Sequence, residues 1–209
     1  VGLSLTMPLK ESIIPLLATI DPVAAQVGAV NTALRTPQGW SGANTDIDGI
    51  VEALRRAGVG ATCSSATILG AGATARSAVA ALHRLGIRVL TVGARRPKAA
   101  RAVADLAESW GMAARAVDLE PAVAMLAVDV VVSCLPGDAA KPWAPLAPGA
   151  TAALLDVSYH PWPSVLAAQW GSSVVASGRD MLLWQAVEQV RLMTGRVPSA
   201  DAMRAALPA

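Results

Sequence analysis

A short glycine-rich segment from Gly70 to Ala75 could bind phosphate groups. It reads Gly-Ala-Gly-Ala-Thr-Ala and fits the pattern G-x-G-x-x-A. The first glycine allows a tight turn, the second lets backbone N–H groups approach a pyrophosphate, and the small last residue lets a helix pack closely on a strand. The N-terminus of the following helix would add N–H donors and a positive dipole end. The segment predicts a dinucleotide site; the alternative is a structural turn in another α/β domain.

Three cations, Arg95, Arg96 and Lys98, follow the next apolar run along the chain. A fold that prefers NAD usually places Asp or Glu at this point, about 20 residues beyond the glycines, to accept a hydrogen bond from the ribose 2′-hydroxyl. No carboxylate is present here. Because a guanidinium suits a doubly charged 2′-phosphate, the cluster favours NADP(H). The alternative for these cations is a solvated start of a helix.

Further polar residues lie within the first 50 positions. Lys10 follows the pair Met7-Pro8, and residues 28–32 and 42–46 place two Asn-Thr pairs and Asp46 among small apolar residues. Asn, Thr and Asp are good hydrogen-bond partners for a polyhydroxylated ligand. Taken alone, Lys10 could equally be a surface residue, and Thr45-Asp46 could merely cap a helix.

The elements that must position these residues alternate between strand and helix. Apolar runs predict strands at 66–69, 87–92, 113–117, 128–135, 152–157 and 173–176. Apolar residues at helical spacing predict helices at 46–57, 73–85, 97–110 and 179–194, with a short helix from about Ser199. We expect an α/β protein with a doubly wound, Rossmann-type NADP domain over residues 60–178. Residues 1–58 would form a second, smaller α/β substrate lobe, incomplete at its N-terminus, to which C-terminal helices over 179–209 return.

The composition limits the other classes of function. The chain has 209 residues, of which 54% are hydrophobic and 15% charged, and a formal net charge of +2. It can bury a sizeable core and carries no dense basic run, so no nucleic-acid partner is expected. Its cysteines and histidines lie outside metal-ligand spacing, so no metal is expected. Without an apolar span or a signal-peptide pattern, we expect a cytoplasmic protein with no membrane partner.

Taken together, the motifs resemble those of shikimate dehydrogenases, and the resemblance runs along essentially the whole chain. The family's G-x-S-V-T-x-P-x-K motif is matched at residues 2–10, G-A-V-N-T at 28–32, N-T-D-x-x-G at 44–49, D-x-x-Y-x-P at 156–161 and G-x-x-M-L-x-x-Q-A at 178–186. The glycine turn lies between them in the family's order. Six motifs in order make this resemblance specific.

The resemblance implies reversible, NADPH-dependent reduction of 3-dehydroshikimate to shikimate, a step of chorismate and aromatic amino acid biosynthesis. Lys10 and Asp46 match the family's catalytic residues, and an ammonium beside a nascent alkoxide can supply both a cation and a proton. The substrate contacts it implies are Thr6, Lys10, Asn31, Asp46, Tyr159 and Gln185. The cofactor contacts it implies are Gly70, Ala71, Gly72, Ala73, Thr74, Arg95, Arg96, Val157, Gly178 and Met181.

The sequence also departs from the family pattern. An upstream Ser-x-Ser element that grips the substrate carboxylate is not found, so we expect the chain to lack the family's N-terminal segment. The usual N-R-T reads Ala94-Arg95-Arg96, and Ala73 replaces the second glycine of a pair. Two alternatives therefore remain: a quinate/shikimate dehydrogenase that uses NAD, and a non-catalytic NADP-binding relative. For the chain itself we expect a small-molecule substrate, shikimate or 3-dehydroshikimate, and a monomer or homodimer.

Overall fold

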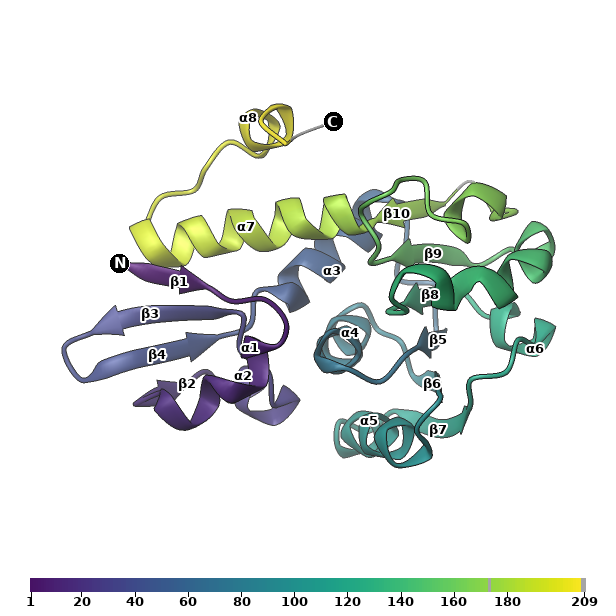
Figure 1. Ribbon diagram of the computed structural model, residues 1–209, viewed down its shortest axis with the longest axis horizontal. Coiled ribbons are helices and arrows are strands. Elements are labelled where there is room, and N and C mark those ends of the chain that lie inside the picture. The colour runs from purple at the N-terminus through teal and green to yellow at the C-terminus, as the bar shows by residue number, and fades with distance from the viewer. Residues whose placement is uncertain (173, 208–209) are drawn as a thin grey trace.

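The computed structural model describes residues 1–172 and 174–207, and within these ranges six parallel strands form the larger sheet (Figure 1). They are β5 (Ser65–Leu69), β6 (Val89–Ala94), β7 (Ala113–Asp118), β8 (Val130–Ser133), β9 (Ala153–Asp156) and β10 (Val175–Ser177). Their order is β10-β9-β8-β5-β6-β7, so the chain reverses direction across the sheet between β5 and β8. This is the doubly wound arrangement in which ligands bind at the reversal point. The predicted Rossmann-type parallel sheet is confirmed.

Several predicted strand bounds are wrong by a few residues. The strand expected at 87–92 is β6 at Val89–Ala94, because residue 87 belongs to the turn after the preceding helix: Gly86 has a φ of 92° and the Ile87 N–H bonds back to the Leu82 carbonyl at 3.1 Å. The strand expected at 128–135 is shorter, β8 at Val130–Ser133, and just before it the Asp129 carboxylate accepts from the Ser64 and Ser65 N–H groups at 2.8 and 2.9 Å. Residue 173 of the last predicted strand lies outside the described residues.

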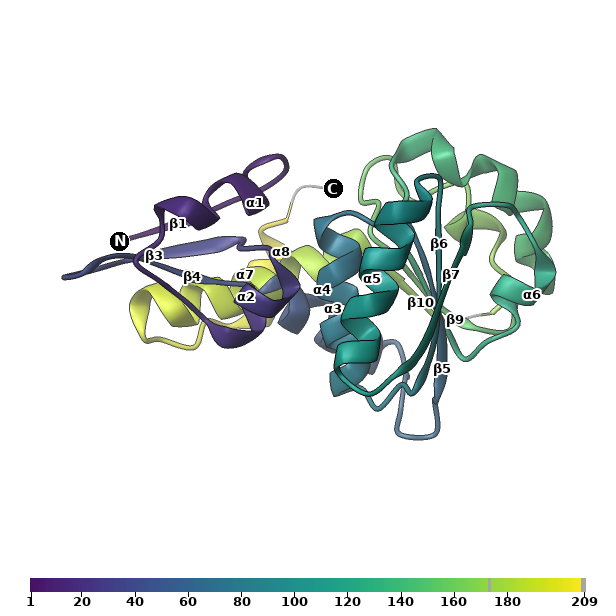
Figure 2. The same cartoon turned by 90° about the horizontal axis from the view of Figure 1, so that it is seen from below.

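Helices cover both faces of the larger sheet (Figure 2). On one face lie α3 (Asp46–Arg56), α4 (Ala73–Arg84) and α5 (Pro97–Ser109), which pack with Ile68, Leu90 and Val132 in one core. On the other lie α6 (Val123–Leu126) and the 3₁₀ segments η2 (Gly137–Gly149) and η3 (Ala167–Gln169), packed on Leu69, Val131 and Leu154. Adjacent strand residues therefore serve opposite cores, which explains why the strands read as unbroken apolar runs.

The smaller sheet lies within residues 2–43, all of which are described, and has the order β1-β3-β4-β2. It is built from β1 (Gly2–Ser4), β2 (Thr19–Ile20), β3 (Thr32–Thr36) and β4 (Gly39–Ala43), joined through α1 (Leu9–Ser12), η1 (Ile14–Leu16) and α2 (Pro22–Val27). Asp21 caps α2 by accepting from the Val23 and Ala24 N–H groups. The β2 strand pairs in parallel with β4, whereas the other pairs are antiparallel.

A long helix joins the two lobes. Helix α7 (Gly178–Thr194) begins where β10 ends, packs along α3 and reaches β3, and is followed by α8 (Ala200–Ala205) (Figure 1). The α3–α7 contact is close at Gly49, where a Cβ would lie 2.6 Å from the Met181 carbonyl oxygen. Among the described residues, no helix combines the length and apolar character needed to cross a bilayer.

Candidate active site

Lys10 and Asp46 form an ion pair between the first turns of two helices. The Lys10 Nζ donates to Asp46 Oδ2 at 2.5 Å, and the two side chains are only 14% and 5% exposed. The Lys10 carbonyl accepts from the Val30 N–H at 2.8 Å, which ties α1 to the strand entry at residues 28–32. The Asp46 N–H donates to Asn44 Oδ1 at 3.1 Å. A buried ammonium and carboxylate are thus held side by side, with the backbone of each anchored.

Asn31 is the centre of a buried hydrogen-bond network around this pair. Its Nδ2 donates to Asp46 Oδ1 at 2.9 Å and to Gln185 Oε1 at 3.1 Å, and its Oδ1 accepts from the Thr45 N–H at 2.8 Å. Gln185 comes from α7, so a distant part of the chain meets residues 31 and 46 here. One turn further along α7, Gln189 Nε2 donates to the Asn31 carbonyl at 3.2 Å. Sequence reasoning missed Thr45 and Gln189 as network members; the helical spacing of Gln189 from Gln185 was the available signal.

Thr6 and Tyr159 lie outside the buried network that the described residues form. Thr6 is exposed, and Tyr159 is 55% exposed on the loop after β9. That loop is anchored by the buried Asp156, which accepts from the Ser158 N–H at 3.0 Å and the Ser164 hydroxyl at 2.6 Å. The structure therefore places both side chains at the solvent side, on segments whose backbones are fixed.

Val157, Gly178 and Met181 lie where this loop meets the start of α7. The Gly178 N–H donates to the Ser158 carbonyl at 3.1 Å. A Cβ on Gly178 would lie 2.1 Å from the Val157 carbonyl oxygen, so only glycine fits at this approach. Ser177 caps α7 in a capping box with Asp180. Met181 is buried, and its backbone packs on Gly49.

The glycine turn lines one end of a cavity of about 480 Å³. Gly70 has a φ of 113°, and a Cβ there would lie 3.2 Å from Cys134. At Gly72, by contrast, no heavy atom of the described residues lies within 4 Å of a Cβ position, so its backbone faces open space. Ala73 and Thr74 start α4 just beyond. Such an uncovered turn at a helix N-terminus fits the phosphates of a dinucleotide.

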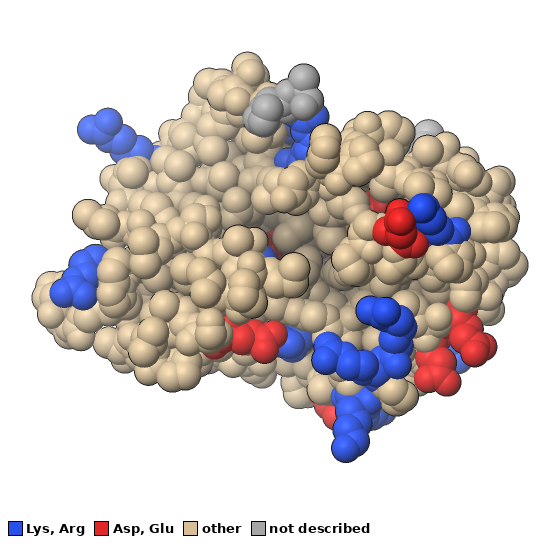
Figure 3. Space-filling view, in the orientation of Figure 1, with Lys and Arg blue, Asp and Glu red and all other residues tan. Residues whose placement is uncertain are grey.

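Arg95 and Arg96 line the same cavity and are exposed. The structure thus brings the glycine turn and the predicted 2′-phosphate residues together, as NADP requires. Figure 3 shows Lys and Arg side chains gathered beside the hollow between the two lobes. Sequence reasoning missed three residues that line this cavity: Cys134, Leu135 and Pro136. They directly follow β8, which is the neighbour of β5 at the point where the strand order reverses.

Cys134 connects the cavity with the ion pair electrostatically. Burial, together with the carboxylates of Asp156 and Asp46, raises the pKa of the Cys134 thiol to about 12, and the Lys10 ammonium offsets part of this rise. The thiol therefore stays protonated and neutral. The charges of Lys10 and Asp46 thus act on a residue that lines the cavity.

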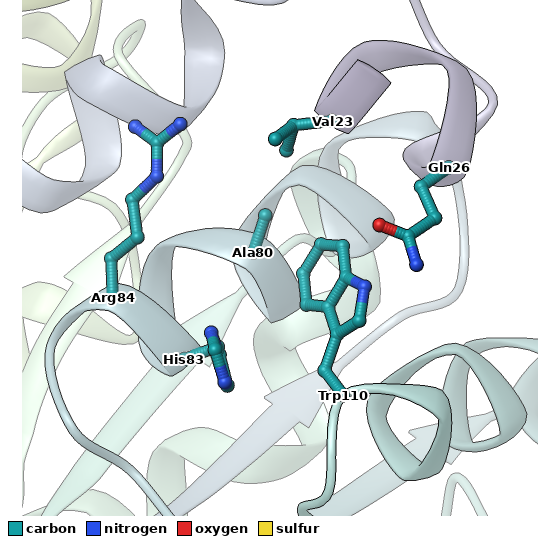
Figure 4. A pocket seen from close by; sticks show the side chains of 6 residues that line it. All are labelled: Val23, Gln26, Ala80, His83, Arg84 and Trp110. Atoms are coloured by element: carbon teal, nitrogen blue, oxygen red, sulfur yellow. The ribbon is translucent and has the colours of Figure 1, made fainter.

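A separate pocket of about 260 Å³ lies near the other end of α4 (Figure 4). It is lined by Val23, Gln26, Ala80, His83, Arg84 and Trp110. The rings of His83 and Trp110 are 5.6 Å apart, and Arg84 pairs with Asp48 at 2.9 Å. This pocket holds none of the residues that the sequence predicted for the site.

A cavity lined by a glycine turn at the reversal point of one sheet, and an ammonium–carboxylate pair in the lobe of the other sheet, are typical of a two-lobed, nicotinamide-dependent oxidoreductase. The chain is 38% identical over 209 residues to a shikimate dehydrogenase (NADP(+)) of Thermus thermophilus, covering 98% of this chain and 76% of the relative. Residues 1–33 match the shikimate dehydrogenase substrate binding domain, and residues 178–207 match the shikimate 5′-dehydrogenase C-terminal domain. The chain belongs to the shikimate dehydrogenase family.

Solved structures are similar over almost the whole chain. The Mycobacterium tuberculosis shikimate dehydrogenase has a TM-score of 0.90 at 38% identity, covering 99% of this chain and 79% of that one. A Thermus thermophilus shikimate 5-dehydrogenase in complex with NADP(H) and shikimate has a TM-score of 0.81 at 33% identity, covering the same shares of the two chains. These relatives support the NADP(H) assignment over the NAD-using and non-catalytic alternatives.

Proposed function

We propose that the chain is an NADP-dependent shikimate dehydrogenase that interconverts 3-dehydroshikimate and shikimate by means of the Lys10–Asp46 pair. The observation that carries the assignment of the pair is the 2.5 Å contact between Lys10 Nζ and Asp46 Oδ2, whose side chains are both largely shielded from solvent. NADPH, when bound, supplies the hydride. Its pyrophosphate would be held by Gly70, Ala71, Gly72, Ala73 and Thr74, its 2′-phosphate by Arg95 and Arg96, and its nicotinamide end by Val157, Gly178 and Met181.

Lys10 provides the proton and the positive charge for the reduction of the ketone. Hydride addition leaves an oxyanion on the substrate, and the Lys10 ammonium stabilises this charge and donates one proton to form the alcohol. Asp46 holds the ammonium in place through Oδ2. Its other oxygen, which accepts from Asn31 in the structure, is suited to accept from a substrate hydroxyl. In the reverse direction Lys10 takes the hydroxyl proton back.

The remaining polar residues would orient the substrate. Asn31 and Gln185 present amide groups beside the pair, with Gln185 held by its own α7 backbone through a bond to the Leu182 carbonyl at 3.1 Å. Thr6 and Tyr159 lie on the solvent side and are suited to meet a hydroxyl or carboxylate group once the substrate is present. We also propose that residues 1–58 and the helices of 179–209 act as one substrate lobe, because α7 packs on α3 and reaches β3. A cytoplasmic location and a monomer or homodimer remain part of the proposal, to be tested by cell fractionation and light scattering.

The experiment is NADPH formation from NADP⁺ and shikimate by the parent chain, by Lys10→Met and by a control, Lys141→Met. Lys141 pairs with the exposed Asp138 and lies on η2, away from the pair. Loss of general acid–base catalysis predicts that Lys10→Met lowers kcat by about 10²–10⁴-fold. NADP⁺ affinity should stay near that of the parent, whereas thermal stability should fall, because the buried Asp46 carboxylate loses its charge partner. An active Lys10→Met variant would refute the role of the lysine; an inactive parent chain would refute the function.

A further inference from the structure

Arg76, on the second turn of α4, reaches from the cofactor lobe into the substrate lobe. Its Nε donates to the Val27 carbonyl at 2.8 Å, and its Nη2 donates to the Gly28 carbonyl at 3.1 Å and to Glu11 Oε1 at 2.7 Å. The Arg76 side chain is 22% exposed. Glu11 is the neighbour of Lys10, and Gly28 starts the segment whose Val30 N–H bonds to the Lys10 carbonyl. A single guanidinium therefore bonds to the backbone of residues 27–28 and to the side chain of the residue that follows Lys10.

Ser77, the next residue of α4, makes the corresponding connection to Asp46. Asn44 Nδ2 donates to Ser77 Oγ at 2.9 Å, and Ser77 Oγ donates to the Ala73 carbonyl at 3.2 Å. Asn44 Oδ1 in turn accepts from the Asp46 N–H at 3.1 Å. These residues form an unbroken chain of hydrogen bonds from the glycine turn to the backbone of Asp46. Ser77 is completely buried, so its hydroxyl has no access to water as a replacement partner.

We infer that Arg76 and Ser77 are positioning residues: they fix Lys10 and Asp46 relative to the bound dinucleotide through the helix that starts at the phosphate turn. This inference rests on the proposed function for the roles of Lys10 and Asp46. Hydride and proton transfer need the reacting groups in register, and a displacement of about 1 Å can cost about 10²-fold in rate. The planar guanidinium loses little freedom for each bond it makes, which suits it to hold three acceptors at once.

A second interlobe arginine on the same helix provides a matched control. Arg84 pairs with Asp48 of α3 at 2.9 Å, and both side chains are more than 40% exposed. This pair bridges the same two lobes, but neither Arg84 nor Asp48 is next to Lys10 or bonds to the Asp46 backbone. If interlobe bridging alone mattered, loss of Arg84 and loss of Arg76 would have similar effects.

The test compares Arg76→Gln, Arg76→Lys and Arg84→Gln in the full chain. For Arg76→Gln we expect kcat/KM for shikimate to fall about tenfold or more, the equivalent of one charge-assisted hydrogen bond, while the Kd for NADP⁺ alone stays within about twofold. Arg76→Lys should recover part of the loss, since its ammonium can reach Glu11 without reproducing the fork. Arg84→Gln should match the parent. Equal losses in the two glutamine variants, or an unchanged Arg76→Gln, would overturn the inference.

Hydrogen exchange gives a readout that does not depend on turnover. In Arg76→Gln we expect faster exchange at the Val30 amide, which bonds to the Lys10 carbonyl, and unchanged exchange in β5. In Ser77→Ala the Asp46 amide should exchange faster, because Asn44 loses one of its anchors. If the parent chain proves inactive, the proposed function fails but these exchange patterns still test the positioning. Unchanged exchange at the Val30 and Asp46 amides would refute it.

Discussion

Replacing Gly72 by alanine should separate cofactor binding from folding. Gly72 has a φ of −90° and a ψ of −169°, which alanine adopts without strain, and no described heavy atom lies within 4 Å of the new Cβ. Stability should therefore stay the same or rise by about 0.4–1 kcal/mol, because alanine restricts the unfolded chain. The same methyl group points into the space that the pyrophosphate must enter. Loss of one charge-assisted hydrogen bond, about 1.5–3 kcal/mol, raises the Kd for NADP⁺ by roughly 10- to 100-fold.

Gly70→Ala, in contrast to Gly72→Ala, should lower the stability of the fold. Its φ of 113° costs a side-chain-bearing residue about 1–2 kcal/mol, and its Cβ would lie 3.2 Å from the Cys134 backbone. Thermal unfolding and calorimetric titration with NADP⁺ measure both quantities for each variant, with Gly60→Ala, in an exposed loop, as control. A Gly72→Ala protein that binds NADP⁺ as tightly as the parent would show that the pyrophosphate does not lie on this turn. A Gly72→Ala protein that unfolds early would contradict the stability reasoning.

Three further predictions concern selectivity, packing and pH. Arg95→Ala should weaken NADPH by about 1.5–3 kcal/mol more than NADH in paired titrations; equal weakening would show that Arg95 does not contact the 2′-phosphate. Gly178→Ala should destabilise the fold by about 1–3 kcal/mol, seen as a lower Tm, because its Cβ would overlap the Val157 carbonyl and force the backbone apart; an unchanged Tm would refute this. Bonds from backbone N–H groups hold the pKa of Asp129 below its ordinary value. The stabilisation from these bonds is therefore present above the unfolded pKa of about 3.9 and is lost as pH falls through the lower folded value, so the Tm difference between the parent and Asp129→Asn should shrink at low pH.

The sequence was sufficient for the larger sheet because its strands are buried on both faces and separated by amphipathic helices. It was insufficient where a tertiary contact decides a boundary. Ile87 has the composition of a strand residue, yet its N–H completes the end of α4. The 3₁₀ segment Gly137–Gly149 contains three prolines, and prolines inside a segment argue against a helix in a sequence pattern.

The same distinction applies to the site. The glycine turn is recognisable because its chemistry is local, and Lys10 and Asp46 are recognisable as parts of motifs. The Cys134–Pro136 wall of the cavity depends on β8 lying next to β5, which is a property of strand order. Gln189 and Arg76 have contacts that span 158 and 65 positions, respectively, along the chain. No local pattern could show which residues they meet.

The close crossing of α3 and α7 at Gly49 bears on how such enzymes can be recombined. Since a Cβ at this position would lie within 2.6 Å of the Met181 carbonyl, the two helices can approach each other only where the side chain is a single hydrogen atom. A chimaera that takes residues 1–58 from one relative and the rest from another must preserve this glycine at the crossover. With any larger residue at position 49, α3 and α7 would be pushed apart, and Gln185 would move away from Asn31.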